Sequence, residues 1–183
     1  MKKLVLSFLF CTLGVGIAHA AGYQLVLVVS GQNCTDILPS GILAQGISVN
    51  SWSWGASDST SGSNGGPIKP GKNSLQNLSV SRITDKCSSD YLHLSLTGMV
   101  SSTVTLTQYQ NNGEGWTPSM VVTLGNAIVS SYQISGSTGG GDPYESLSFA
   151  FQKICIENKI NNTRACWNAS TNAPYSVAPI NAP

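Results

Sequence analysis

Four of the five cysteines lie beyond residue 20, and they carry the most reactive side chains of the chain: Cys34, Cys87, Cys155 and Cys166. An even number of cysteines indicates disulfides where a chain reaches an oxidising compartment, and four cysteines allow three pairings. Zinc binding is the rival use, but the sequence lacks CxxC and CxxH spacing, and His93 is the only histidine beyond residue 20. We therefore expect disulfides and no metal site.

One pairing has a geometric argument. Residues 159–162 form a four-residue hairpin loop in this interpretation, so Asn158 opposes Thr163 and Cys155 opposes Cys166. Directly opposed residues of antiparallel strands have Cα atoms about 4.5–5.5 Å apart, within disulfide range. Such a bridge stabilises a fold by about 2–3 kcal/mol. The other two cysteines then pair by elimination.

Catalytic patterns are absent from the sequence. No G-x-S-x-G elbow accompanies His93, which we expect on the surface of a helix. The glycine-rich stretches match neither the Walker nor the dinucleotide pattern. No motif selects a pair from the carboxylates that a glycosidase would need, namely Asp58, Asp85, Asp90, Glu114, Asp142, Glu145 and Glu157. We expect no enzyme activity and no cofactor.

Residues 1–20 read as a signal peptide. Lys2 and Lys3 precede an uncharged run over residues 4–18, and Ala18-His19-Ala20 supplies a small-x-small cleavage pattern before Ala21. The alternative is a buried N-terminal helix. Cleavage after Ala20 predicts a secreted or periplasmic protein with no membrane span.

The charge balance excludes two classes of partner. Without Lys2 and Lys3, seven of the nine basic residues remain, against eight acidic residues. This balance gives neither a basic stripe for nucleic acid nor a polybasic patch for anionic lipid.

Alternation of apolar and polar residues predicts strands over residues 24–29, 47–54, 103–109, 120–134 and 145–156. One helix is predicted at about residues 88–98. Leu92, Leu96 and Met99 share its apolar face, Asp85 or Ser88 caps it, and Gly98 ends it. The sequence therefore predicts a mainly β, antiparallel domain over residues 21–172 and a proline-containing tail over residues 173–183.

Two segments are rich in glycine and serine: one runs from Gly55 to Lys72, the other from Gly136 to Pro143. Both read as loops inside the domain because predicted strands flank them. Ordering such loops costs about 1–2 kcal/mol per residue, so we expect them to settle where a partner covers them.

Several segments, in order, resemble the haemolysin-coregulated protein (Hcp) family, whose members form the tube of bacterial type VI secretion. The similar segments are residues 46–57, 71–80, 85–86, 92–98, 130–133 and 145–149, and the pair Trp167-Asn168. The resemblance covers about residues 23–170. It implies a β-barrel of two antiparallel sheets with one helix, and a homohexameric ring that stacks into a tube and escorts effector proteins.

Two features depart from the family pattern, because tube subunits carry no signal peptide and act from the cytoplasm, where disulfides are rare. Both departures favour a family member that works outside the inner membrane. The loops from Gly55 to Lys72 and from Gly136 to Pro143 are then candidate contacts between subunits. An alternative is an exported, monomeric binding module for a glycan or protein, using its loops or Trp52, Trp54, Trp116 and Trp167.

Overall fold

The computed structural model describes residues 22–58 and 73–176. The predicted signal peptide, Lys72 and the end of the tail lie outside these residues. The described part contains one helix and eleven strands: β1 (Gly22–Val29), β2 (Ile47–Val49), β3 (Ser51–Ser53), β4 (Ala56–Asp58), β5 (Asn73–Leu75), β6 (Leu78–Ile83), α1 (Ser88–Thr97), β7 (Ser101–Asn111), β8 (Trp116–Ser135), β9 (Tyr144–Asn158), β10 (Thr163–Asn168) and β11 (Ala173–Pro174).

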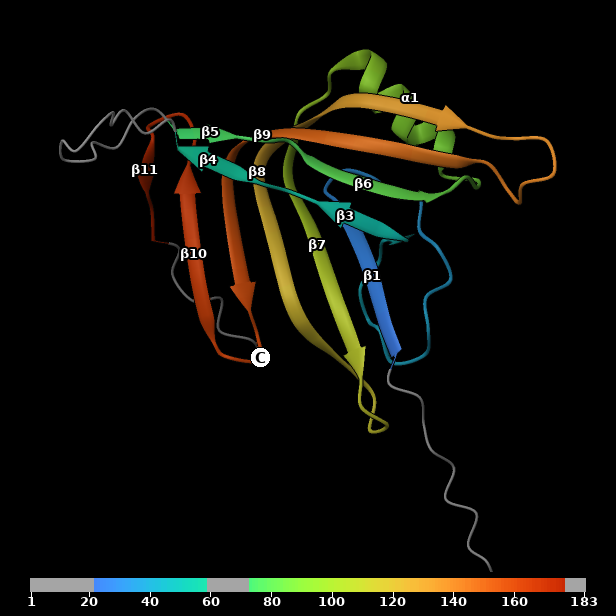
Figure 1. Cartoon of the computed structure of the whole chain (residues 1–183), viewed down its shortest axis with the longest axis horizontal. Coiled ribbons are helices and arrows are strands. Elements are labelled where there is room, and N and C mark those ends of the chain that lie inside the picture. Colours follow the sequence, from blue (N-terminus) through green and yellow to red (C-terminus); the bar gives the residue numbers. More distant parts are fainter. Residues whose placement is uncertain (1–21, 59–72, 177–183) are drawn as a thin grey trace, which may run out of the picture.

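The strands form two antiparallel layers that share the long strands β8 and β9 (Figure 1). One layer follows the order β11-β10-β9-β8-β7-β1-β2, and the other adds β6 and β3 beside the first half of β9. β4 and β5 form a separate two-stranded ribbon. The prediction of a mainly β fold with two antiparallel sheets and one helix is confirmed.

The predicted single strand over residues 47–54 is two strands, because the chain changes layers at Asn50. β2 pairs with β1 in one layer, and β3 pairs with β6 in the other. The Asn50 N–H donates to the Ser81 carbonyl at 2.8 Å, which links the two layers on this side. The shared strands β8 and β9 link them on the opposite side.

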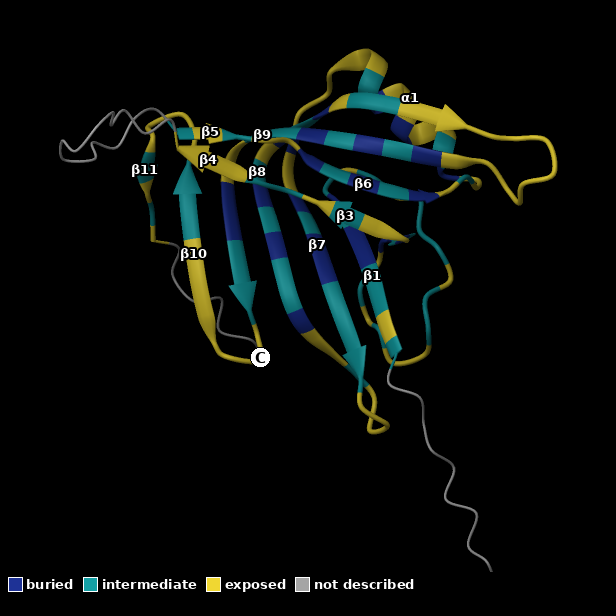
Figure 2. Ribbon diagram, viewed as in Figure 1, coloured by how far each residue is buried: buried dark blue, intermediate teal, exposed yellow. Residues whose placement is uncertain are grey.

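The core lies between the layers and follows the period of two that strands impose. Leu27, Leu106 and Val122 stand in one cross-strand row and are almost fully buried. Leu147 and Phe149 of β9 face the same core from the other layer. Figure 2 shows buried positions alternating with intermediate ones along the middle of β8 and the first half of β9.

The helix ends as predicted, but its buried face was predicted wrongly. Gly98 adopts φ 62°, a left-handed conformation that favours glycine, and its N–H donates to the Leu94 carbonyl at 3.1 Å. Tyr91 and Leu94 are the residues that the helix buries. Leu92 and Leu96 share a face of the helix, but that face is exposed, by 42% and 78%. Met99 lies beyond the end of the helix and is 52% exposed.

The predicted cap of the helix is also wrong. Cys87 occupies the N-cap position without a side-chain hydrogen bond. Asp85 instead accepts from the Cys87 N–H at 2.7 Å, and the Asp85 N–H donates to the Ser88 hydroxyl at 3.0 Å. These bonds form a turn that leads into the helix.

Among the described residues, no helix has both the length and the apolar composition needed to cross a membrane.

Candidate functional site: a buried charge cluster and an indole groove

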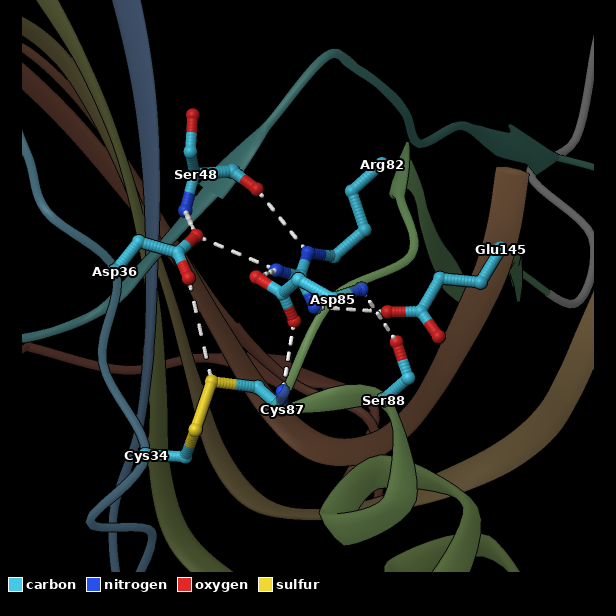
Figure 3. The surroundings of a disulfide bond; sticks show 8 residues. All are labelled: Cys34, Asp36, Ser48, Arg82, Asp85, Cys87, Ser88 and Glu145. Carbon is cyan, nitrogen blue, oxygen red and sulfur yellow. Dashed lines mark hydrogen bonds and ion pairs between the residues drawn. A yellow bond between two sulfur atoms is a disulfide. The ribbon is translucent and has the colours of Figure 1, made fainter. Parts of the chain in front are cut away.

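A buried arginine contacts three carboxylates from separate parts of the chain. Arg82 lies on β6 with only 2% of its surface exposed. It donates from Nη1 to Glu145, directly opposite on β9, at 2.8 Å, and from Nη2 to Asp36 at 3.3 Å. Nη2 also contacts Asp85, which precedes the helix (Figure 3). We call Arg82, Asp36, Asp85 and Glu145 the charge cluster.

Polar neighbours complete the hydrogen bonding of the charge cluster. Arg82 Nε donates to the Ser48 carbonyl at 3.3 Å. The Tyr132 hydroxyl donates to Glu145 at 2.7 Å, and burial together with this bond raises the pKa of Tyr132 to about 12. Burying a charge is costly unless it is paired and hydrogen-bonded. Both conditions hold here.

Asp36 and Asp85 both face the Nη2 atom of Arg82. Burial, followed by the hydrogen bond with Asp85, raises the pKa of Asp36 above its usual value. Burial also opposes the ionisation of Asp85, but hydrogen bonds with Asp36 and Arg82 hold the pKa of Asp85 below its usual value. The pKa values of the two carboxyl groups therefore shift in opposite directions.

A disulfide adjoins the charge cluster. Cys34 is bonded to Cys87 with Cα atoms 5.6 Å apart, which ties the segment over residues 30–46 to the start of α1. Asp36 gives this segment further anchors, because its N–H donates to the Gly46 carbonyl at 2.9 Å and its carboxylate accepts from the Ser48 N–H at 2.6 Å. The segment is thus held at several points although it has no regular structure.

The atoms beside this disulfide do not form a metal site. Asp36, Asp85 and Cys87 bring three possible ligand atoms within 4.8 Å of one another. The Cys87 sulfur, however, is already bonded to Cys34, and both carboxylates face Arg82. A thiolate is the form that binds metal, and a disulfide cannot supply one.

The second disulfide lies where the hairpin argument places it. β9 and β10 pair Asn158 with Thr163 and Cys155 with Cys166, and the bonded cysteines have Cα atoms 4.1 Å apart. The Tyr175 hydroxyl lies 3.1 Å from Cys155 Sγ, so the described part of the tail folds back over this bridge.

The structure separates the four tryptophans into different environments. Trp52 packs against the core, and Trp116 lies beside Gly22 and Gly41. Trp54 and Trp167 come together at a groove of about 370 Å³ that the β4–β5 ribbon helps to form. Both indole N–H groups are buried without a hydrogen-bond partner in the described part of the chain. A buried donor left in this state costs about 1–3 kcal/mol.

The remaining candidate residues stay apart. His93 is exposed on α1, as expected. Gly55 lies beside the Gln76 side chain, whereas its loop partner Lys72 falls outside the described residues. The segment from Gly136 to Pro143 is an exposed hairpin tip between β8 and β9, and it projects beyond the helix (Figure 1).

Sequence reasoning missed Asp36 and Arg82. One signal was available for the arginine, because Leu78, Val80 and Arg82 occupy alternate positions of one strand, and all three are buried. A charge at an inward position of a strand predicts a partner. No comparable pattern marks Asp36.

The contributions of Asp85 and Asp36 to the free energy of unfolding should change in opposite directions with pH. Asp85→Asn should lower the free energy of unfolding by about 1–2 kcal/mol at pH 7, because Arg82 and the Cys87 N–H lose a charged acceptor. The folded-state pKa of Asp85 is depressed, so this contribution is present above about pH 4 and is lost as the pH falls through the folded pKa.

Asp36→Asn should cost less at pH 7, because the folded-state pKa of Asp36 is raised. A raised pKa stabilises the fold below the unfolded pKa, and that stabilisation is lost as the pH rises through the folded pKa. Urea unfolding of both variants at pH 7 and at pH 3 measures the difference. An equal loss for Asp85→Asn at the two pH values would contradict the assignment of charge.

Known proteins share this fold. A family model described as "Type VI secretion system effector, Hcp" matches residues 43–157. No curated protein matches the chain. A solved structure described as a type six secretion system protein is 20% identical, with a TM-score of 0.73, and the alignment covers 84% of this chain and 100% of that one.

Two further solved structures give the same result. Hcp1 from Salmonella typhimurium is 19% identical, with a TM-score of 0.68, over 84% of this chain and 99% of that one. A type VI secretion system effector from Yersinia pestis is 16% identical, with a TM-score of 0.60, and the alignment covers 84% of this chain and 99% of that one. At such identities the structures establish the fold, and the family model covers well over half of the chain.

Proposed function

Because the chain belongs to the Hcp family of type VI secretion system effectors, we propose that it is an exported structural subunit that assembles into a ring of six copies. The match over residues 43–157 carries the proposal. Proteins of this family form homohexameric rings. The family resemblance implies that such rings stack into a tube and escort effector proteins, and we propose the same for this subunit. Such a subunit works through its surfaces and needs no catalytic group.

Disulfides support the exported location. Cys34–Cys87 and Cys155–Cys166 both lie at bonding distance in the folded chain. Disulfides persist in the periplasm and outside the cell, and they are rare in the cytosol. Cleavage between Ala20 and Ala21 would deliver the chain to such a compartment through general export.

Exposed apolar side chains supply surface for ring contacts. The outward face of α1 presents Leu92 and Leu96, and the exposed Met99 and Val100 follow the end of the helix. Ile134 and Tyr144 are 60% and 50% exposed at the base of the hairpin tip that runs from Gly136 to Pro143. A closed ring needs two different patches on each subunit, one that meets the preceding copy and one that meets the next. The helix face and the hairpin are the two patches that we propose.

Native and denaturing mass spectrometry of the exported, oxidised protein test the proposal together. Denatured protein should have the mass of a chain that begins at Ala21, reduced by the hydrogens lost in two disulfides. Native protein should have six times that mass. Replacing residues 137–142 with Asn-Gly should leave the subunit folded, because a four-residue connection that keeps Gly136 and Pro143 still joins β8 to β9. The replacement should remove the six-fold species.

A matched control changes another of the described hairpins. Replacing residues 159–162 with Asn-Gly shortens the β9–β10 connection and should leave the six-fold species intact. A stable monomer of the unaltered protein at high concentration would contradict the ring. A mass that includes Met1 would contradict export through cleavage.

A further inference from the structure

Two adjoining hollows surround Trp167 and form one continuous surface. The larger, of about 370 Å³, is lined by Trp54, Ser57, Asn73, Leu75 and Trp167 among others. The smaller, of about 210 Å³, adds Gln76, Asn77, Phe151 and Asn172. Asn73, Leu75 and Trp167 line both hollows. We call the combined surface the indole groove.

The indole groove is built by segments that are distant in sequence. The β4–β5 ribbon supplies Asn73 and Leu75, and β10 supplies Trp167. In Figure 1 the ribbon lies beside the ends of β10 and β11. Trp167 is fixed from behind, because it opposes Ile154 in the sheet and packs against the core. One wall of the groove is therefore rigid.

The chemistry of the lining restricts the ligand. Trp54, Phe151 and Trp167 are only partly buried, so their rings offer apolar surface. The amides of Asn73, Gln76, Asn77 and Asn172 offer both donors and acceptors. Among the described residues, no lysine or arginine lines either hollow, so this part of the lining offers no cation to an anionic ligand. Asp58 is the only carboxylate among the described lining residues, and it is already engaged in another interaction.

A neutral saccharide matches this combination. The C–H face of a sugar ring packs on an aromatic side chain, and its hydroxyl groups pair with amides, which both donate and accept. The volume of the larger hollow lies within the range of small-molecule sites. The buried N–H groups of Trp54 and Trp167 have no acceptor in the described part of the chain, so each is a hydrogen-bond donor without a partner beside the hollow.

From these observations we infer that the indole groove binds a neutral saccharide, with Trp54 and Trp167 as the stacking surface and Asn73 as a hydrogen-bonding residue. The inference does not depend on ring assembly. It gives an exported structural subunit a means of attachment to glycan surfaces.

Isothermal titration of the oxidised protein with cellotriose, maltotriose and tri-N-acetylchitotriose tests the inference. At least one of the three should bind, and Trp167→Ala should weaken that binding at least tenfold. Asn73→Ala should weaken it severalfold without a risk to the core, because Asn73 lies in the ribbon outside the two main layers. Urea unfolding of each variant shows whether it remains folded.

Trp116→Ala is the matched control. Trp167 stands in one cross-strand row with Ile154 and Leu124. Trp116 begins β8, eight residues along the strand from Leu124, and is therefore distant from Trp167. The control should bind as the unaltered protein does. Absence of binding for all three sugars, or equal binding by the Trp167→Ala variant, would overturn the inference.

Tryptophan fluorescence distinguishes a saccharide site in the indole groove from a contact between subunits of the ring. Fluorescence of Trp54 and Trp167, isolated in a Trp52→Phe, Trp116→Phe background, should change on addition of the sugar and not on dilution of the protein. A change that follows dilution alone would make the groove a contact between subunits, and it would overturn the saccharide assignment while leaving the proposed ring in place.

Discussion

Replacing Arg82 with methionine should lower the free energy of unfolding by about 3–5 kcal/mol. Methionine has a similar length and no charge, so the variant leaves Glu145 without its cationic partner. The Glu145 side chain is fully buried, and it pairs with Arg82 at 2.8 Å. This is the ion pair of the cluster in which both members are buried. Removal of one member of a buried pair leaves a desolvated charge. Urea unfolding at pH 7 measures the loss.

Arg164→Met is the control for this experiment. Arg164 pairs with Glu157 at 3.0 Å, but both side chains contact solvent. Exposed pairs contribute about 0–1 kcal/mol, so the control variant should unfold nearly as the unaltered protein does. Arg82→Met combined with Glu145→Gln should recover part of the lost stability, because the second change removes the stranded charge. Equal losses for Arg82→Met and Arg164→Met would refute the structural role of the cluster.

Local rules predicted the features that depend on neighbours in sequence. The Cys155–Cys166 pairing follows from a hairpin register within a dozen residues, and the structure has that register. The helix end at Gly98 follows from glycine's tolerance of positive φ. The resemblance to the Hcp family supplied the topology, which the period of two alone could not give.

Long-range packing decides the features that sequence reasoning missed or misplaced. The charge cluster joins Asp36, Arg82, Asp85 and Glu145, whose approach depends on the strand order rather than on their spacing. The outward position of Leu92 and Leu96 has the same origin. Apolar spacing predicts that residues share a helix face, but the contacts of Tyr91 and Leu94 decide which face is buried.

The charge cluster and the Cys34–Cys87 bridge act on the same segment. Asp36 and Cys34 are two residues apart, and both hold residues 30–46 against the start of α1 and the end of β6. Ile37 and Leu43 of this segment are 100% and 95% exposed. Exposed apolar side chains on a firmly anchored segment lose little entropy when they meet a partner, which suits a subunit that works by contact.

Removal of the Cys34–Cys87 bridge should therefore cost more than removal of the Cys155–Cys166 bridge. The first spans 53 residues and the second 11, so their loop-closure entropies correspond to about 4 and about 3 kcal/mol. Paired alanine substitutions avoid placing a hydroxyl at the fully buried Cys87 position. Urea unfolding should rank the two double variants in this order.

Hydrogen exchange distinguishes the local effect of each bridge. The Cys34→Ala, Cys87→Ala variant should lose protection at the Asp36 N–H, which donates to the Gly46 carbonyl, because the anchored segment opens without its covalent tie. The Cys155→Ala, Cys166→Ala variant should keep that protection, since β9 and β10 still pair along their length. A larger loss of stability in the second variant would contradict the expected order. Unchanged exchange at the Asp36 N–H in the first variant would show that the charge cluster alone holds the segment in place.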